Sequence, residues 1–157
     1  MTVPNAIRPF SISAFVVRKD PEKRNFLLMQ CSSKPLRGDW QIVSGDCEEG
    51  EKVWLTALRE VRQQTGLMAN ELYSADFIEF FYDSTQDVIK HVPVFVAVVD
   101  GKRPVRVSLK KHDAFEWLTY ADARARLAFE CQKKAIDHVQ KKFVDREPNQ
   151  RFRIEAK

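Results

Sequence analysis

The amino-acid sequence predicts a single α/β domain with a mixed β-sheet packed between helices. Apolar segments of strand length lie on both sides of a segment with helical periodicity, and a second helical segment follows near the C-terminal end. The chain has 157 residues, the size of one ordinary domain with its own core. Hydrophobic residues make up 44% of the chain and charged residues 31%, as in globular proteins.

The N-terminal third is predicted to form strands joined by turns. Residues 7–17 are rich in Ile, Phe and Val, and Pro9 predicts that this strand begins at a sheet edge. Four further segments are expected in order: a turn over 20–24, a returning strand over 25–30, a loop over 34–39 and a short strand over 40–44 that ends at Gly45.

The middle of the chain changes to helical periodicity. One apolar stripe is formed by Val53, Trp54, Ala57, Leu58 and Val61. Gly66 is predicted to end this helix in a left-handed conformation, which glycine adopts without steric strain.

The C-terminal half is expected to return to strands and to finish with a helix. The predicted strands cover 75–82, 91–99 and 115–118, and the predicted helix covers 130–143. The predicted domain therefore spans residues 1–144, and residues 145–157 are expected to form a charged, loosely held tail.

Neither a membrane span nor a secretory signal is expected from the sequence. The longest apolar run, residues 92–99, has the length of a strand. The N-terminus lacks a basic region followed by an apolar one, so a cytoplasmic location is expected. Three widely spaced cysteines, Cys31, Cys47 and Cys131, fit neither a disulfide framework nor a zinc knuckle.

The positive charge of the chain favours anionic partners in general. The formal net charge is +4, with basic residues gathered over 101–111 and again beyond Lys133. These basic runs contain few aromatic residues and no recognisable nucleic-acid motif. We therefore favour a solvated basic face over a nucleic-acid surface.

Residues 45–67, GDCEEGEKVWLTALREVRQQTGL, carry the pattern that points to chemistry. Positions 60, 63 and 64 lie three and four apart, so Glu60, Gln63 and Gln64 share one face of the predicted helix and are expected to point into a cleft. Carboxylates on such a face suit Mg²⁺, which prefers oxygen ligands. Divalent ions of this kind assist the cleavage of pyrophosphate linkages.

This segment resembles the sequence box of Nudix hydrolases, G-x5-E-x7-R-E-U-x-E-E-x-G-U, where U is a bulky aliphatic residue. Seven fixed positions are filled by Gly45, Glu51, Arg59, Glu60, Val61, Gly66 and Leu67. Gln63 and Gln64 stand where the box has a pair of glutamates. The resemblance implies the α/β/α sandwich of Nudix proteins, with a mixed β-sheet between helices.

The resemblance also assigns roles to the matching positions. Glu60 matches the glutamate that binds metal or acts as base, and Arg59 the arginine that holds a catalytic glutamate. Gln63, Gln64 and Ser44 match metal-ligand positions, and the implied cofactor is Mg²⁺ or Mn²⁺. The substrate-binding candidates are Gly45, Arg37, Trp40 and His112. Further stacking candidates are Phe80, Phe81 and Tyr82.

Outside the box the chain resembles the bacterial dihydroneopterin triphosphate pyrophosphatases, also described as dATP pyrophosphohydrolases. The similar pieces are Arg8-Pro9, Asp39-Trp40-Gln41, Val43-Ser44-Gly45, and His112 followed by Trp117-Leu118. That subgroup places a metal-binding glutamate just before the histidine, where this chain has Lys111.

Two readings of the glutamine pair remain open. At about 4 Å and an effective dielectric near 20, one carboxylate attracts a divalent ion by roughly 8 kcal/mol before dehydration is subtracted, so two amides weaken metal binding. The first hypothesis is a metal-dependent hydrolase of reduced metal affinity, cleaving a pyrophosphate linkage in a nucleoside triphosphate or other nucleoside diphosphate derivative.

The alternative is a catalytically degenerate module that binds a nucleotide or phosphorylated ligand. A third hypothesis is a protein or RNA partner that docks on the basic C-terminal region. The family resemblance also allows a homodimer.

Overall fold

The computed structural model describes residues 3–108 and 110–155, so the ends of the predicted domain and tail at residues 1–2 and 156–157 lie outside it. The strands are β1 (Ser11–Val17), β2 (Phe26–Cys31), β3 (Trp40–Gln41), β4 (Val43–Asp46), β5 (Glu71–Asp83), β6 (Val88–Val98) and β7 (His112–Leu118). The helices are α1 (Val53–Thr65), α2 (Tyr120–Arg126) and α3 (Glu130–Val139), followed by a π-helical turn η1 (Gln140–Val144) and a 3₁₀ turn η2 (Gln150–Phe152).

The strands form one mixed sheet of seven strands. Its main order is β3-β2-β1-β6-β5, with β4 paired to β1 and β7 paired to β2. β1 and β6 run parallel, from Ser13 opposite Val94 to Val17 opposite Val98. The recorded pairs of β1 with β2 and β4, of β2 with β3 and β7, and of β5 with β6 are antiparallel.

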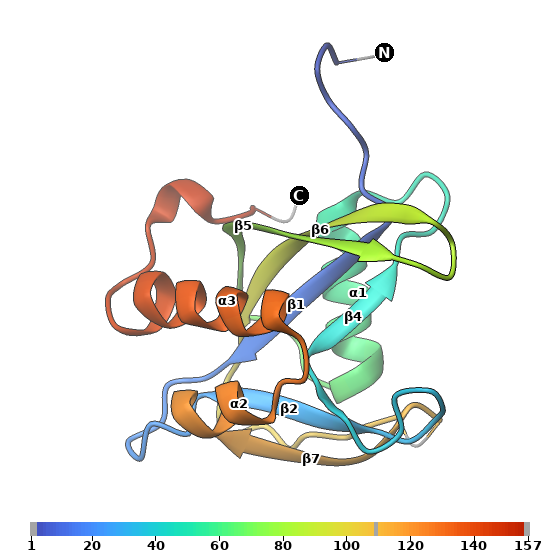
Figure 1. Cartoon of the computed structure of the whole chain (residues 1–157). Coiled ribbons are helices and arrows are strands. Elements are labelled where there is room, and N and C mark those ends of the chain that lie inside the picture. The colour runs from blue at the N-terminus through green and yellow to red at the C-terminus, as the bar shows by residue number, and fades with distance from the viewer. Residues whose placement is uncertain (1–2, 109, 156–157) are drawn as a thin grey trace.

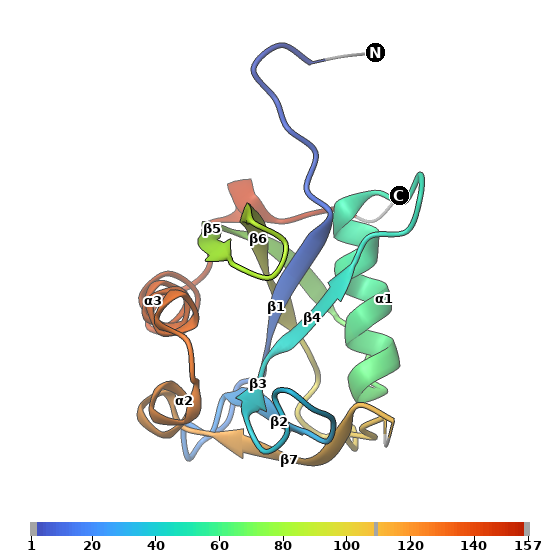
Figure 2. The same cartoon turned by 45° about the vertical axis from the view of Figure 1, so that its right-hand side comes forward.

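Helices cover both faces of this sheet, which confirms the predicted α/β/α sandwich (Figure 1). In β1 the side chains alternate between the two faces, as in any strand. Ile12, Ala14 and Val16 pack with Ala57 and Val61 of α1. On the other face, residues of β1 such as Phe15 pack with α3. Figure 2 shows the sheet between α1 on one side and α2 with α3 on the other.

β1 lies inside the sheet, so the prediction that Pro9 keeps its beginning at an edge was wrong. The strand starts at Ser11, two residues after Pro9, and pairs with β4 from that residue onward. Because proline stands before the strand, its missing N–H removes no hydrogen bond from the sheet.

The predicted central helix is confirmed, and it ends as expected. Gly66 has a φ of 73°, and its N–H donates to the carbonyl of Arg62. Ala57 and Val61 of the predicted stripe are fully buried. A Cβ at position 66 would lie 3.2 Å from Cβ of Arg106, so the turn after α1 is closely packed.

Two features of the C-terminal region differ from the prediction. α2 was not anticipated, because its seven residues are too short to show an apolar period. The tail is held rather than loose. Phe152 packs against the core cluster, and the N–H of Ile154 donates to the carbonyl of Leu72 at 2.8 Å.

Within the described part of the chain, every helix is too short or too polar to cross a bilayer.

Candidate functional site

The candidate site is centred on the contact between Glu60 of α1 and Gly45 of β4. The carboxyl of Glu60 packs directly on Gly45, so closely that a Cβ at position 45 would lie 2.4 Å from Cδ of Glu60. Glycine is therefore required here by this close approach. Glu60 is consequently buried, with 5% of its surface exposed, rather than pointing into an open cleft as predicted.

Arg59 uses all five of its N–H donors within the site. Nε and Nη2 donate to the two carboxylate oxygens of Glu51 at 2.9 and 3.0 Å. Nη1 donates to Oε1 of Glu60 at 2.7 Å and, more weakly, to Oε1 of Gln63 at 3.5 Å. Nη2 also donates to the carbonyl of Asp46 at 2.9 Å. A guanidinium has five such donors, so Arg59 locks the loop, the helix and Glu60 together.

Glu51 is held as a carboxylate by this arrangement. Its pKa is lowered to about 2 by Arg59 first, then by the Thr56 hydroxyl and the backbone N–H of Glu48. Thr56 donates to Oε1 of Glu51 at 2.6 Å, and the Glu48 N–H donates to the same oxygen at 3.1 Å. The charge of Glu51 in turn raises the pKa of Arg59.

Gln64 bridges the two oxygens that the box resemblance assigns to metal binding. Its Nε2 donates to Oε2 of Glu60 at 2.6 Å and to the carbonyl of Ser44 at 2.7 Å. Gln64 is itself buried, with 3% exposed, whereas Gln63 lies on the exposed side of α1. The amide therefore joins Glu60 to β4 by two short hydrogen bonds.

Lys111 completes the surroundings of Glu60. Its Nζ lies 4.0 Å from Oε2 of Glu60, and its side chain is 58% exposed. Glu60 thus has Arg59 beside one oxygen, and the Gln64 amide and Lys111 beside the other.

These residues do not fit a site for a divalent metal ion. Two of the four positions assigned to metal binding are neutral amides. Of the other two, the Ser44 carbonyl and Oε2 of Glu60 accept hydrogen bonds from Gln64, and Oε1 of Glu60 accepts one from Arg59. The ammonium group of Lys111 lies 4.0 Å from Oε2 of Glu60, and its positive charge would repel a metal ion bound there. Over the described ranges, no group of three or more His, Cys, Asp or Glu is arranged to hold a metal ion.

The structure brings together six of the predicted site residues and leaves three apart. Ser44, Gly45, Arg59, Glu60, Gln63 and Gln64 form the contacts given above. Arg37 is exposed in the loop between β2 and β3. The Trp40 ring packs on the α2 and α3 face, with Cζ of Arg126 4.9 Å from its centre.

His112 is the third residue that lies apart from these contacts. It is 4% exposed in β7, and its Nδ1 has no hydrogen-bond partner among the described residues. Burial lowers its pKa, and the charge of Lys111 lowers it further while Asp113 opposes the shift. Burial therefore favours the neutral form of this imidazole.

The stacking candidates on β5 lie on an exposed part of its hairpin with β6. Phe80 and Tyr82 are 64% and 60% exposed, and Phe81 is 39% exposed. Tyr82 donates its hydroxyl to Asp87 within the same hairpin. None of their recorded polar contacts reaches the surroundings of Glu60.

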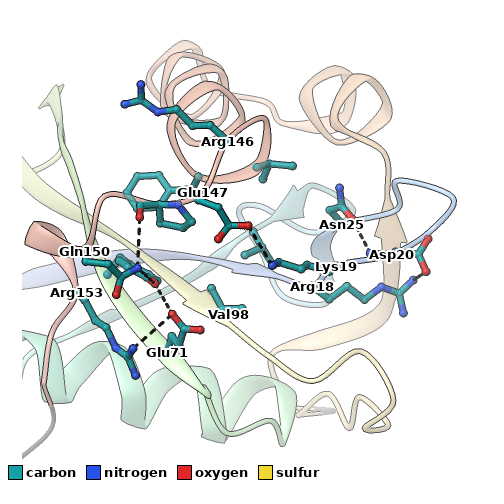
Figure 3. A pocket seen from close by; sticks show the side chains of 15 residues that line it. Arg18, Lys19, Asp20, Asn25, Glu71, Val98, Arg146, Glu147, Gln150 and Arg153 are labelled. Carbon is teal, nitrogen blue, oxygen red and sulfur yellow. Dashed lines mark hydrogen bonds and ion pairs between the residues drawn. The ribbon is translucent and has the colours of Figure 1, made fainter.

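A cavity of about 490 Å³ lies elsewhere, between the end of β1, the start of β5 and the C-terminal segment (Figure 3). Its basic residues face acidic ones, as in Lys19 with Glu147 at 3.5 Å and Arg153 with Glu71 at 4.0 Å. The lining includes none of the predicted site residues. Its charges are largely paired among themselves.

Sequence reasoning missed two contributors to the site. Thr56 carries no motif signal, because its role depends on the turn that returns Glu51 to the helix. Lys111 was noticed only as a departure from the subgroup pattern. That alignment was the available signal, since a glutamate at the same position would also lie near Glu60.

Comparison with known proteins gives the family. The sequence matches the family model described as the NUDIX domain over residues 9–144. An octanoyltransferase of Myxococcus xanthus is 31% identical over 136 residues, which are 85% of this chain and 36% of that protein. The asymmetrical bis(5'-nucleosyl)-tetraphosphatase of Mus musculus is 29% identical over 126 residues, 77% of this chain and 82% of that one. The chain spans between 29% and 42% of the length of the first three curated relatives that it matches.

Solved structures share the fold. The NUDIX domain of Shewanella oneidensis NrtR, complexed with ADP ribose, matches with a TM-score of 0.70 and 18% identity, over 89% of this chain and 92% of that one. The dihydroneopterin triphosphate pyrophosphohydrolase of E. coli matches with a TM-score of 0.63 and 20% identity, over 83% and 96%. Such identities establish the fold alone. With the family match over most of its length, the chain belongs to the NUDIX domain family.

Proposed function

We propose that this chain binds a nucleotide-derived ligand that carries a diphosphate, at the surface around Glu60, without metal-assisted cleavage. The observation that carries the proposal is the Gln64 amide, which donates to both Glu60 and the Ser44 carbonyl. A donor group between these oxygens stabilises them without a cation. Glu60 in addition forms an ion pair with Arg59 at 2.7 Å, and Lys111 lies 4.0 Å away.

The ligand class is inferred from likeness. The NrtR NUDIX domain was solved with ADP ribose, a nucleoside diphosphate derivative, and shares the fold of this chain. ADP ribose and diadenosine tetraphosphate are therefore suitable first probes. Both contain the phosphate–phosphate linkage that the family resemblance implies.

Calorimetric binding in EDTA and in Mg²⁺, with chromatographic analysis of the nucleotides afterwards, tests this proposal. We expect wild type to bind at least one probe in EDTA, with an affinity that Mg²⁺ changes less than threefold, and to leave the probe intact. Binding only in the presence of Mg²⁺, or no binding of any probe, contradicts the proposal.

A second candidate function is hydrolysis that depends on Mg²⁺ or Mn²⁺. The ion-paired group of Glu51, Arg59 and Glu60 favours it. These three residues match the box, and Arg59 contacts both glutamates. Candidate substrates are dinucleoside polyphosphates, after the mouse relative's name, and nucleoside or dihydroneopterin triphosphates. Turnover by wild type that disappears in Glu60→Gln establishes this candidate and rejects the first.

The double variant Gln63→Glu/Gln64→Glu separates a degenerate enzyme from an active one. If the amides alone prevent hydrolysis, the variant gains metal-dependent turnover that wild type lacks. Equal turnover in both proteins means that other groups compensate. Because Gln64 is buried beside Glu60, the unfolding midpoint of the variant is measured in parallel.

A further inference from the structure

The donors that surround Glu60 differ in what they have left for a ligand. Arg59 directs each of its N–H groups to a recorded partner in the protein. The Gln64 amide nitrogen has two N–H groups and donates to two acceptors. Neither side chain has a donor free for a phosphate.

Lys111 has donors to spare. An ammonium group has three N–H donors, and its recorded ion pair is the one with Glu60 at 4.0 Å. The side chain is 58% exposed while that of Glu60 is 6% exposed, so the lysine lies beside the buried carboxylate and is itself open to solvent. Of these donors around Glu60, Lys111 is therefore the one that a phosphate can contact from solvent.

The carboxylate of Glu60 also attracts this ammonium group. Glu60 is itself held by Arg59 and Gln64, both within hydrogen-bonding distance. A lysine tethered to a fixed anion loses less conformational freedom when a ligand binds. Lysine is a common ligand of phosphate, acting as a point charge.

We propose that Lys111 supplies the positive charge that binds the ligand's diphosphate, in place of a divalent metal ion. This inference rests on the proposed function, because it names the residue that makes metal-free binding work. It also accounts for three differences from the resembled pattern, which has glutamate at positions 63, 64 and 111. Gln63 and Gln64 remove negative charge, and Lys111 replaces a negative charge by a positive one.

The test compares Lys111→Ala with Lys110→Ala. Lys110 is the adjacent exposed lysine, so its loss changes the net charge equally without touching Glu60. ADP ribose and inorganic pyrophosphate are titrated into each protein in EDTA. We expect Lys111→Ala to weaken binding at least tenfold and Lys110→Ala less than threefold, with unfolding midpoints close to wild type.

The possible failures are distinguishable. Equal weakening by the two variants overturns the role of Lys111 and leaves the proposed function standing. Absence of wild-type binding in EDTA overturns both proposals.

A second measurement titrates Mn²⁺ alone and follows it by electron paramagnetic resonance. Wild type is expected to bind Mn²⁺ only in the millimolar range, and Gln63→Glu/Gln64→Glu/Lys111→Glu at least tenfold more tightly. Tight Mn²⁺ binding by wild type that is lost in Glu60→Gln overturns the replacement of the metal by lysine.

Discussion

Glu60 shows how single residues set the character of this site. Its carboxyl is enclosed by Gly45, Arg59, Gln64 and Lys111, which supply space, charge and hydrogen bonds. A carboxylate buried in this way depends on every partner, because an unpaired buried charge is strongly destabilising. A side chain at position 45 would displace this carboxyl, so the contact requires glycine there.

Replacement of Gly45 by alanine is expected to lower the free energy of unfolding by about 1–3 kcal/mol, the usual cost of overpacking. The new Cβ would stand 2.4 Å from Cδ of Glu60, and β4 cannot move away from its partner β1. Urea denaturation of Gly45→Ala measures the change. Gly101→Ala is the comparison, since the atoms nearest to its Cβ belong to the Arg18 side chain and lie at 3.1 Å or more. Equal stability of Gly45→Ala and wild type contradicts the close contact.

Glu51 makes stability depend on pH in the acid range. Its pKa is lowered from 4.5 to about 2, so its contribution is fully present above pH 4.5 and is lost as the pH falls through 2. We expect wild type to exceed Glu51→Gln in unfolding free energy at pH 6, and the difference to shrink steadily towards pH 2. Denaturant unfolding across this range measures it, with the exposed Glu49→Gln as control. A constant difference would disprove the role assigned to Glu51.

At the scale of elements, α1 is the part that joins fold and site. Its inner side packs on β1 through Ala57 and Val61, and its next face carries Glu60 and Gln64 against β4. Its end is set by Gly66, whose φ of 73° places the following chain beside Arg106. The helix register, and with it the position of Glu60, depends on this C-terminal turn.

Gly66→Ala is expected to destabilise the protein by roughly 1–2 kcal/mol, because a residue with Cβ is strained at positive φ. Gly66→Asn has the same Cβ but tolerates the left-handed conformation better, so it should cost less. Thermal unfolding of both variants provides the measurement. Equal losses would mean that crowding against Arg106, rather than the backbone angle, determines the cost.

Across the whole molecule, the C-terminal segment closes the side of the sandwich occupied by α3. Phe152 packs on the same core cluster as Tyr73 and Phe143, and Arg153 pairs with Tyr73 in an isolated bridge. The segment beyond the family match is thus part of the packed structure.

Phe152→Ala is expected to lower the unfolding free energy by about 1–2 kcal/mol, since the ring is partly buried. Phe10→Ala, the same change at a ring that is 78% exposed, should stay within about 0.5 kcal/mol of wild type. Guanidinium unfolding compares the two. Equal small effects would support the loosely held tail that the sequence suggested.

The sequence predicted the positions of helices and strands better than the contacts between residues that are distant in the chain. Apolar periodicity identified the helix that ends at Gly66, because that pattern is local. The edge position predicted from Pro9 was wrong. A proline removes a sheet hydrogen bond only when it lies within the strand, and β1 begins at Ser11. The box positions identified Glu60 and Arg59, but the contacts of Gln64 with Ser44, twenty residues away, and of Lys111 with Glu60 exist only in the folded chain.

The parallel pairing of β1 with β6 has a consequence for how the chain acquires its structure. The parallel neighbour of β1 follows it roughly 80 residues later in the chain. Until β6 is present, the side of β1 that pairs with it stays open, and closing so long a loop slows folding. A chain cut after Asp87 should therefore show no cooperative unfolding in circular dichroism, although it contains α1 and the entire box. The contacts of Glu60 with Gly45, Arg59 and Gln64, although all within the box segment, are therefore expected to form only when the distant strand is present.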